Sequence, residues 1–186
     1  MTEKTEVKRH AHPGRGGKAM PHPKGRQIDP DAAEQIHTLL GNGSRTRDML
    51  IEHLHLIQDK YGCLSAVHLV ALADEMHMAL TEVYEVATFY AHFDVVIDEA
   101  DRPPPITIRV CDSVTCELLG SERLIQSLSK ACDANIRILR APCMGACDKA
   151  PAVAIGHKQI APAITEEVLK VAGSGHHPST QIYQEL

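Results

Sequence analysis

The chain has 186 residues, of which 44% are hydrophobic and 23% are charged, and its formal net charge at pH 7 is -5. This length allows one domain or two small ones. The absence of an apolar run of about eighteen residues excludes a membrane-spanning helix, and we expect no direct membrane contact. Seven Lys or Arg and two Glu put segment 1–27 near +5, so the remainder is near -10, which argues against a nucleic-acid partner.

Segment 1–27 is rich in Gly, Pro, His and basic residues and has no apolar periodicity. We expect a disordered tail, or a basic arm that becomes ordered against an acidic partner. Its histidines, His10, His12 and His22, have no ligand-like spacing. The segment lacks the apolar core of a secretory signal peptide. We therefore expect a cytoplasmic protein, in which paired cysteines more often bind metal or do redox chemistry than form disulfides.

Residues 28–97 predict a small bundle of four helices with short connections. Asp29 followed by Pro30 is typical of a helix start, and this helix is expected to end at about Leu40, before a Gly-Asn-Gly turn. The expected limits of the other three helices are Ser44 or Thr46 to Gly62, Ser65 to beyond Met76, and Thr81 to about His92.

The predicted bundle also carries four histidines and one cysteine. Solvated or hydrogen-bonded side chains are the expected state of His53, His55, His68 and His77. Because His53 and His55 are two residues apart on a helix, they are expected to face different directions. Cys63 has no second cysteine nearby, so we interpret it as a structural or free thiol.

Residues 98–105, DEADRPPP, are acidic and then proline-rich, which is typical of a domain boundary and a semi-rigid spacer. Segment 106–172 predicts a small thioredoxin-like α/β layer in βαβ-ββα order, and 173–186 predicts a loose C-terminal tail. Strands are expected at residues 106–110, 135–141, 152–156 and about 158–161, and helices at 117–131 and 164–172. Gly156-His157 is expected to form the turn of the final hairpin.

Four of the six cysteines lie in two tight pairs within this layer. Cys111 and Cys116 follow the first strand, and Cys143 and Cys147 follow the second. Strands that are joined by a crossover helix are parallel neighbours. Both cysteine loops should then leave the same edge of the sheet, and the four thiols should converge. Cys132, at the far end of the crossover helix, is expected to point away from both loops and not to be a ligand.

The spacing of these thiols leaves three kinds of site open. Structural zinc sites use similar cysteine pairs. Thiol–disulfide exchange of the thioredoxin type needs two residues between its cysteines, and neither pair has that spacing. A [2Fe–2S] cluster takes four thiolates. Our hypothesis for that case places Cys111 and Cys116 on one iron and Cys143 and Cys147 on the other.

The composition of the two loops favours the cluster, because its net negative charge needs hydrogen-bond donors. Residues 112–115 supply backbone N–H groups and two hydroxyls, and the helix at 117–131 is expected to point its positive end towards the site. Gly145 lets the backbone approach a sulfur without a Cβ clash. The sequence has no nucleophile elbow, phosphate-binding glycine loop or dinucleotide fingerprint. A chain that holds only such a cluster can pass single electrons but cannot bind a nicotinamide or oxidise a substrate. Its electrons must therefore pass to a partner.

The cysteine pattern resembles the 24-kDa-type subunit of NADH dehydrogenases and other thioredoxin-like [2Fe–2S] ferredoxins, with RVCDSVTC at the first pair and CMGACDKAPAV at the second. The helical segments LIQDKYGCLS and LTEVYEVATFYAHFDV resemble the same subunit, so the likeness covers about residues 29–172. The interval between the pairs is shorter than in many members, which we interpret as a trimmed helix or loop. The resemblance implies an α+β chain, a helical bundle followed by a [2Fe–2S] ferredoxin domain, and it implies four cluster ligands: Cys111, Cys116, Cys143 and Cys147.

Within that family, two segments look most like the diaphorase part of NAD-dependent formate dehydrogenases, HPGRGGKAMPHPKGRQIDP and LIEHLHLIQDKYG. There the same module is a separate gamma subunit or the N-terminal part of a fused beta subunit. The resemblance implies a flavoprotein partner that carries FMN, NAD and a [4Fe–4S] cluster. It also implies a further partner that oxidises formate at a molybdenum or tungsten pterin centre.

The leading hypothesis is an electron-transfer subunit of a soluble NAD-dependent formate dehydrogenase, which exchanges single electrons with the FMN of its partner and is not catalytic alone. The alternative in the same class is the equivalent subunit of respiratory complex I or of an NAD-reducing hydrogenase. A zinc-stabilised structural adaptor is an alternative from another class and predicts a colourless protein. A thiol–disulfide enzyme would require a reactive cysteine of low pKa outside any cluster.

Overall fold

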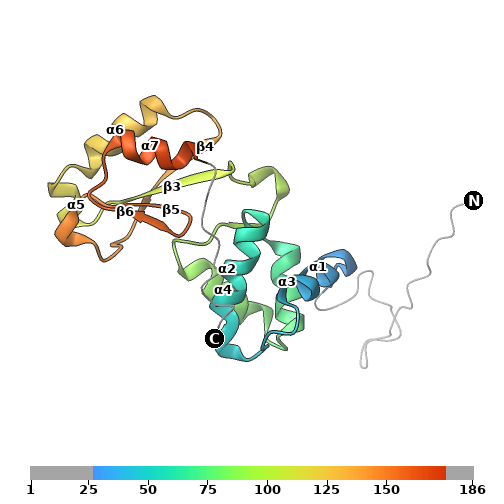
Figure 1. Cartoon of the computed structure of the whole chain (residues 1–186). Coiled ribbons are helices and arrows are strands. Elements are labelled where there is room, and N and C mark those ends of the chain that lie inside the picture. Colours follow the sequence, from blue (N-terminus) through green and yellow to red (C-terminus); the bar gives the residue numbers. More distant parts are fainter. Residues whose placement is uncertain (1–26, 175–186) are drawn as a thin grey trace, which may run out of the picture.

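A computed structural model of the chain describes residues 27–174, and Figure 1 shows its helices and strands. Four N-terminal helices form one part of the molecule, the helical region (residues 30–89). A sheet with its own helices forms the other part, the sheet region (residues 106–173). Most of both predicted tails, with His10, His12 and His22, lies outside the described residues. Within the described range, no helix is long and apolar enough to cross a membrane.

The helical region packs its four helices around one hydrophobic core. The helices are α1 (Pro30–Leu40), α2 (Leu50–Tyr61), α3 (Ala66–Glu75) and α4 (Leu80–Phe89), and a 3-10 turn (Arg47–Met49) takes up residues where the second helix was expected to start. All four contribute fully buried side chains, namely Ile36, Leu54, Ile57, Leu69, Leu72 and Val83. Helices this short are marginal alone, so burial of this shared core holds them together.

Capping side chains determine where α1 and α3 begin. The Asp29 carboxylate accepts hydrogen bonds from the backbone N–H groups of Asp31 and Ala32, at 2.9 and 3.0 Å. The Ser65 hydroxyl accepts one from the backbone N–H of His68, at 3.4 Å. Both side chains satisfy donors that have no partner inside the helix. Both of these caps are predicted from the sequence, whereas the cap expected at Thr81 for α4 is not found.

The limits of α4 differ from the prediction. The helix begins at Leu80 rather than after Thr81, because the Glu82 carboxylate accepts a hydrogen bond from the backbone N–H of Ala79 at 3.4 Å and so satisfies the earlier position. It ends at Phe89, three residues before the expected end. The residues released from the helix form a loop that approaches the sheet region.

The sheet region contains a four-stranded sheet in the order β4-β3-β5-β6. The strands are β3 (Ile106–Cys111), β4 (Ile136–Ala141), β5 (Val153–Ile155) and β6 (Lys158–Ile160). β3 and β4 are parallel over their full lengths, whereas β5 runs antiparallel to both of its neighbours. The predicted parallel pair and the predicted hairpin at Gly156-His157 are confirmed.

Two helices, α6 (Ser121–Ala131) and α7 (Thr165–Gly173), contact each other and lie against the sheet, as Figure 1 shows. Together they bury the core of this region, which includes Ile108, Val110, Leu128, Val153, Ile155 and Val168. Because side chains alternate along a strand, the residues next to Ile108 and Val110 in β3 face the other way. That opposite face is the one that meets the loop after α4.

The prediction of one helix over 117–131 is wrong. A short helix, α5 (Val114–Leu118), precedes α6, and Gly120 separates the two. The backbone of Gly120 has φ of 106°, in the left-handed region that glycine adopts without a Cβ penalty. The glycine therefore ends the first helix and lets the second one begin in a new direction.

The loop between the two regions is tied to both of them. β1 (Leu64–Ser65) and β2 (Val95–Val96) form a short parallel pair that the sequence does not predict. Just before β2, Asp94 forms ion pairs with Arg109 of β3 at 2.8 Å and with Arg137 of β4 at 2.6 Å. The side chain of Arg109 is only 7% exposed, so this contact is largely shielded from water.

Candidate metal centre

Both cysteine loops leave the same edge of the sheet. Cys111 is the last residue of β3, and its register partner on β4 is Ala141, two residues before Cys143. Parallel pairing therefore brings the two loops together, as the sequence predicts. Cys116 lies within α5, which begins at Val114, so the helix starts before this cysteine and not after it as expected.

The four cysteines form an inner pair and an outer pair. Cys111 and Cys116, the inner pair, are 1% and 2% exposed and pack with Ala152 in a small apolar cluster. Cys143 and Cys147, the outer pair, are exposed, and their Sγ atoms lie 3.4 Å apart. One side of the site is therefore buried in the protein, and the other side faces the surface.

Hydrogen-bond donors surround the outer pair. The backbone N–H of Gly145 donates to the sulfur of Cys143 and lowers the pKa of that thiol. Gly145 has φ of 81°, so glycine suits this position of the loop. The nearby thiol of Cys143 raises the pKa of Cys147, and a hydrogen bond from the Thr115 hydroxyl opposes that rise. These donors stabilise negative sulfur, as the loop sequences predict.

The inner pair has a different environment. Burial is the largest cause that raises the pKa of the Cys116 thiol, and its contact with Cys111 raises it further. A hydrogen bond from the backbone of Ala152 acts in the opposite direction. A buried thiol with a raised pKa, such as that of Cys116, ionises with difficulty unless a cation compensates its charge. The inner pair therefore suits metal coordination better than a role as free thiolates.

The sulfur positions distinguish one metal ion from a two-iron cluster. Zinc holds four thiolates in a tetrahedron at about 2.3 Å, which puts each pair of sulfurs about 3.8 Å apart. Cys143 and Cys147 are near that separation. A single zinc ion would need the other sulfurs at a similar spacing. Among the described residues, however, the group whose ligand atoms all lie within 4.8 Å of one another consists of histidines, not of these cysteines. Two neighbouring pairs of thiols fit a [2Fe–2S] cluster better than a single zinc.

The remaining two cysteines lie elsewhere. Cys63 is fully buried beside β1 in the helical region, and burial raises the pKa of its thiol. Cys132 follows α6 and packs against the core of the sheet region. Neither joins the four converging cysteines, which is the arrangement expected from the sequence. All six cysteines are free thiols in this structure.

The histidines of the helical region follow the prediction with one difference. His53 bonds the carbonyl oxygen of Ser44 at 2.9 Å, His68 bonds the side chain of Gln35 at 2.9 Å, and His77 is exposed. The buried Nδ1 atoms of His53, His55 and His68 all lack a hydrogen-bond partner, but His55 differs from the other two in that no hydrogen bond of its ring is found among the described residues.

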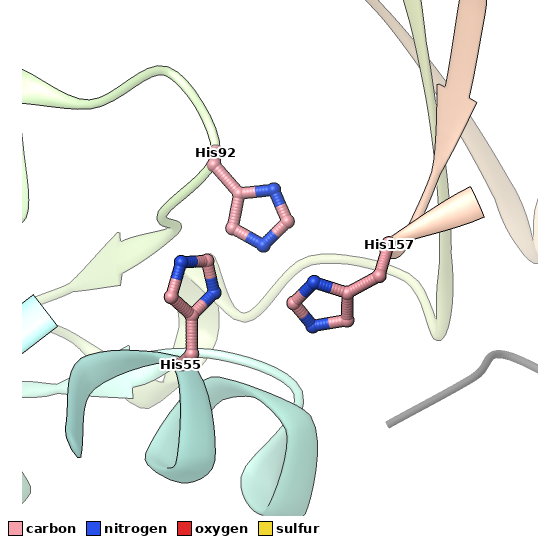
Figure 2. Close-up of side chains that lie close together, drawn as sticks. All are labelled: His55, His92 and His157. Carbon is pink, nitrogen blue, oxygen red and sulfur yellow. The ribbon is translucent and has the colours of Figure 1, made fainter. Parts of the chain in front are cut away.

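Instead, His55 lies with His92 and His157 in a cluster that the sequence reasoning missed (Figure 2). Burial is the largest cause that lowers the pKa of His92 to about 4. The three residues come from α2, from the loop after α4 and from the β5–β6 turn. No local spacing could reveal the cluster, because only the tertiary structure brings these segments together.

Comparison with known proteins gives a family and a fold. The family profile of the thioredoxin-like [2Fe–2S] ferredoxins matches residues 36–173. The E subunit of NADH-quinone oxidoreductase from Aquifex aeolicus is 31% identical over 116 residues, which cover 58% of this chain and 69% of that protein. The corresponding protein of Buchnera aphidicola (subspecies Baizongia pistaciae) is 30% identical over 132 residues, which cover 65% of this chain and 73% of that protein.

Among solved structures, a crystal structure of an NAD⁺-reducing [NiFe]-hydrogenase in the air-oxidized state is similar, with a TM-score of 0.54 and 22% sequence identity. The similarity covers 72% of this chain but only 24% of the hydrogenase chain. At this identity the likeness concerns the fold. The thioredoxin-like arrangement expected for the sheet region is supported by the family match.

Proposed function

The chain belongs to the thioredoxin-like [2Fe–2S] ferredoxin family, and from this premise we propose that it is an electron-transfer subunit of an NAD-dependent oxidoreductase complex. In this proposal one [2Fe–2S] cluster is held by Cys111, Cys116, Cys143 and Cys147. The proposed location is the cytoplasm, where thiols stay reduced. The subunit is not catalytic alone.

One observation carries the proposal: the four thiols converge from two loops and are arranged as neighbouring pairs with hydrogen-bond donors. When bound, a [2Fe–2S] cluster supplies transfer of single electrons. Gly145 and Thr115 donate hydrogen bonds to the sulfurs of the outer pair, and such bonds help to set the reduction potential. The inner pair, Cys111 and Cys116, holds its side of the site away from water.

The surface beside the cysteines suits a protein partner. Val114, Leu118 and Leu119, in and just after α5, are 72%, 80% and 58% exposed. Exposed apolar side chains that gather next to a functional site are typical of interaction surfaces. The exposed outer pair of cysteines lies next to this helix, because Thr115 of α5 contacts Cys147. We propose that the electron partner docks here.

The finer proposal is that the complex is a formate dehydrogenase. It rests on the likeness of HPGRGGKAMPHPKGRQIDP and LIEHLHLIQDKYG to the diaphorase part of those enzymes. In it, a flavoprotein subunit carries FMN, NAD and a [4Fe–4S] cluster, and a further subunit oxidises formate at a molybdenum or tungsten pterin. The equivalent subunit of complex I or of an NAD-reducing hydrogenase is the alternative, and the named relatives fit it as well.

The proposal is tested on the native complex, purified anaerobically through a tag on this chain. Addition of NADH should produce the electron paramagnetic resonance (EPR) signal of a reduced [2Fe–2S] cluster, and the Cys143→Ser chain should lose that signal. Identification of the co-purified subunits then decides the donor: a pterin enzyme, membrane subunits or a nickel–iron subunit. The contradicting outcome is a cluster that dithionite reduces but NADH leaves oxidised. That result would exclude electron exchange between the cluster and NAD in this complex.

A further inference from the structure

We propose that His55, His92 and His157 form a second metal site, which binds one divalent first-row transition metal ion such as Zn²⁺ between the helical region and the sheet region. One ligand atom from each histidine lies within 4.8 Å of those of the other two. Figure 2 shows the three rings around one common space, each reaching it from a different segment of the chain. The site goes beyond the proposed electron-transfer function.

The register of the sheet separates this site from the cysteines. Cys111 lies at the end of β3, whereas Ile155, the last residue of the antiparallel β5, pairs with Ile108 near the start of β3. His157 follows Ile155 by two residues, so it lies towards the opposite edge of the sheet from the cysteine loops. The histidines therefore form an independent site and do not extend the cysteine site.

The hydrogen bonds of His157 leave one nitrogen for an ion. Its Nε2 atom donates to the Asp59 carboxylate, at 2.8 Å from Oδ1 and 3.1 Å from Oδ2. A neutral imidazole that donates through Nε2 carries its lone pair on Nδ1. Metal-binding histidines usually donate their other ring nitrogen to a carboxylate in this way, which orients the ring and strengthens the ligand. Asp59 is thus a positioning residue for His157.

His55 supplies an independent observation. Its Nδ1 atom is buried and has no hydrogen-bond partner, and a buried polar atom without a partner destabilises the folded state. The ring centroid of His55 lies 4.7 Å from that of His92 and 5.1 Å from that of His157. A bound ion would satisfy the unpaired nitrogen, whereas simple packing of neutral rings leaves it unpaired.

The distances and ligand types indicate the class of ion. Zinc binds histidine nitrogen at about 2.0–2.1 Å in a tetrahedron, which sets the nitrogens about 3.3 Å apart. The ligand nitrogens now lie within 4.8 Å of one another, and small side-chain rotations that move each nitrogen by about an ångström would bring them to that separation. Imidazole ligands suit zinc, copper and nickel rather than magnesium or calcium. A cavity of about 160 Å³ adjoins the site on the side of Asp59, His92 and His157, which line part of it, and it has room for a water molecule that could act as a further ligand.

Such an ion would connect three segments that are distant in the sequence. His55 belongs to the helical region, His92 to the loop and His157 to the sheet region. An ion that binds only the folded chain stabilises it by mass action. We therefore infer that the ion fixes the two regions relative to each other.

The test uses the full chain with its iron–sulfur cluster loaded, so that the four cysteines cannot bind the probe. Zn²⁺ is titrated from a chelator buffer into the wild type, His92→Gln and His157→Gln. The wild type should bind one zinc through this site, and each variant should lose that affinity by more than about 100-fold, since an outer hydrogen-bond partner alone is worth 10–100-fold. Asp59→Ala should weaken binding by about 10-fold. Iron content should stay unchanged in every variant.

The control is His77→Asn, which removes an exposed histidine from a residue with φ of 53°, a conformation that asparagine tolerates. It should bind zinc as the wild type does. X-ray absorption of the zinc-loaded wild type does not depend on variant folding. It should show nitrogen or oxygen neighbours at about 2.0 Å and no sulfur at about 2.3 Å. Sulfur neighbours, no zinc bound at micromolar concentration, or unchanged affinity in folded His92→Gln and His157→Gln would overturn the proposal.

Discussion

At the scale of single residues, Thr115 gives a direct test of how the loops tune the site. Its hydroxyl donates a hydrogen bond to the sulfur of Cys147. Hydrogen bonds to cluster sulfurs favour the more negative, reduced state, so Thr115→Val should make the reduction potential more negative, on the order of tens of millivolts. The measurement is a redox titration followed by EPR.

The matched control is Thr88→Val in α4, because the Thr88 hydroxyl bonds the carbonyl oxygen of Tyr84 in the helical region. This variant should keep the wild-type potential. Equal potentials for Thr115→Val and the wild type would show that the hydroxyl has no influence on the cluster.

His68 predicts a pH dependence of stability. Burial is the main cause that lowers the pKa of His68. Its ring stacks on Tyr61, its Nε2 bonds Gln35, and its buried Nδ1 has no partner. The unfolded chain, with a histidine pKa of about 6.5, takes up a proton more readily than the folded chain. The contribution of neutral His68 to the free energy of unfolding should therefore be fully present above about pH 6.5. It should be lost progressively as the pH falls below that value.

Other buried histidines act in the same direction, so the contribution of His68 must be isolated by a variant. Urea unfolding, followed by circular dichroism, should show that His68→Gln loses less stability between pH 7.5 and 5.5 than the wild type does. A variant that loses as much stability as the wild type would remove His68 from the explanation.

The sequence predicts the cysteine site far better than the histidine cluster, and the reason is the distance along the chain. Cys111 and Cys143 follow two strands of one βαβ unit, for which a general rule sets parallel pairing. His55 and His157 have no local pattern in common, because their proximity depends on how the two regions pack. The position of Gly145 is only partly explained by the sequence reasoning: its positive φ favours glycine, but a Cβ at this position would meet no atom within 4 Å, so the expected clash with a sulfur is not found.

At the scale of secondary-structure elements, Asp94 holds the loop after α4 against the sheet. It forms ion pairs with Arg109 and Arg137, and burial is the largest cause that lowers the pKa of Arg109. Asp94→Asn would leave two guanidinium groups near each other without their carboxylate. Removal of one partner from a buried ion pair is strongly destabilising, so we expect the free energy of unfolding to fall by about 3 kcal/mol in urea denaturation.

The comparison variant is Glu122→Gln, which removes the carboxylate that pairs with Arg140 at 2.6 Å on the surface. Surface ion pairs contribute little because water and salt screen them. The unfolding midpoint of Glu122→Gln should therefore stay close to that of the wild type. A loss of stability as small in Asp94→Asn as in Glu122→Gln would mean that the loop contact is not a structural anchor.

The division of the crossover helix shows a limit of pattern reading at this scale. Helical periodicity continues across Gly120, so the sequence alone predicts one helix over 117–131. The left-handed conformation of Gly120 and the separate packing of α5 near the cysteines emerge only in the tertiary structure. By contrast, the starts of α1 and α3 could be predicted because a single capping side chain determines each one.

At the scale of the whole molecule, we propose a division into a helical domain, 28–97, and a cluster domain, 106–172, joined by the spacer 98–105. Several contacts cross this division, among them the Asp94 ion pairs, the hydrogen bonds from Arg109 to the backbone of the loop after α4, and the bond from His157 to Asp59. We therefore expect the two domains to keep a fixed orientation, which a proline-rich spacer alone would not impose.

The central claim is that the four converging cysteines hold a [2Fe–2S] cluster, and one measurement tests it directly. It determines iron, acid-labile sulfide and zinc per chain after anaerobic purification, together with the EPR spectrum after dithionite reduction. We predict about two irons and two sulfides and a rhombic spin-half signal for the wild type. We expect the same for Cys63→Ser and Cys132→Ser, and a loss of iron and signal for Cys143→Ser. Zinc without iron or signal at the cysteines, or loss of the cluster in Cys132→Ser, would contradict the account.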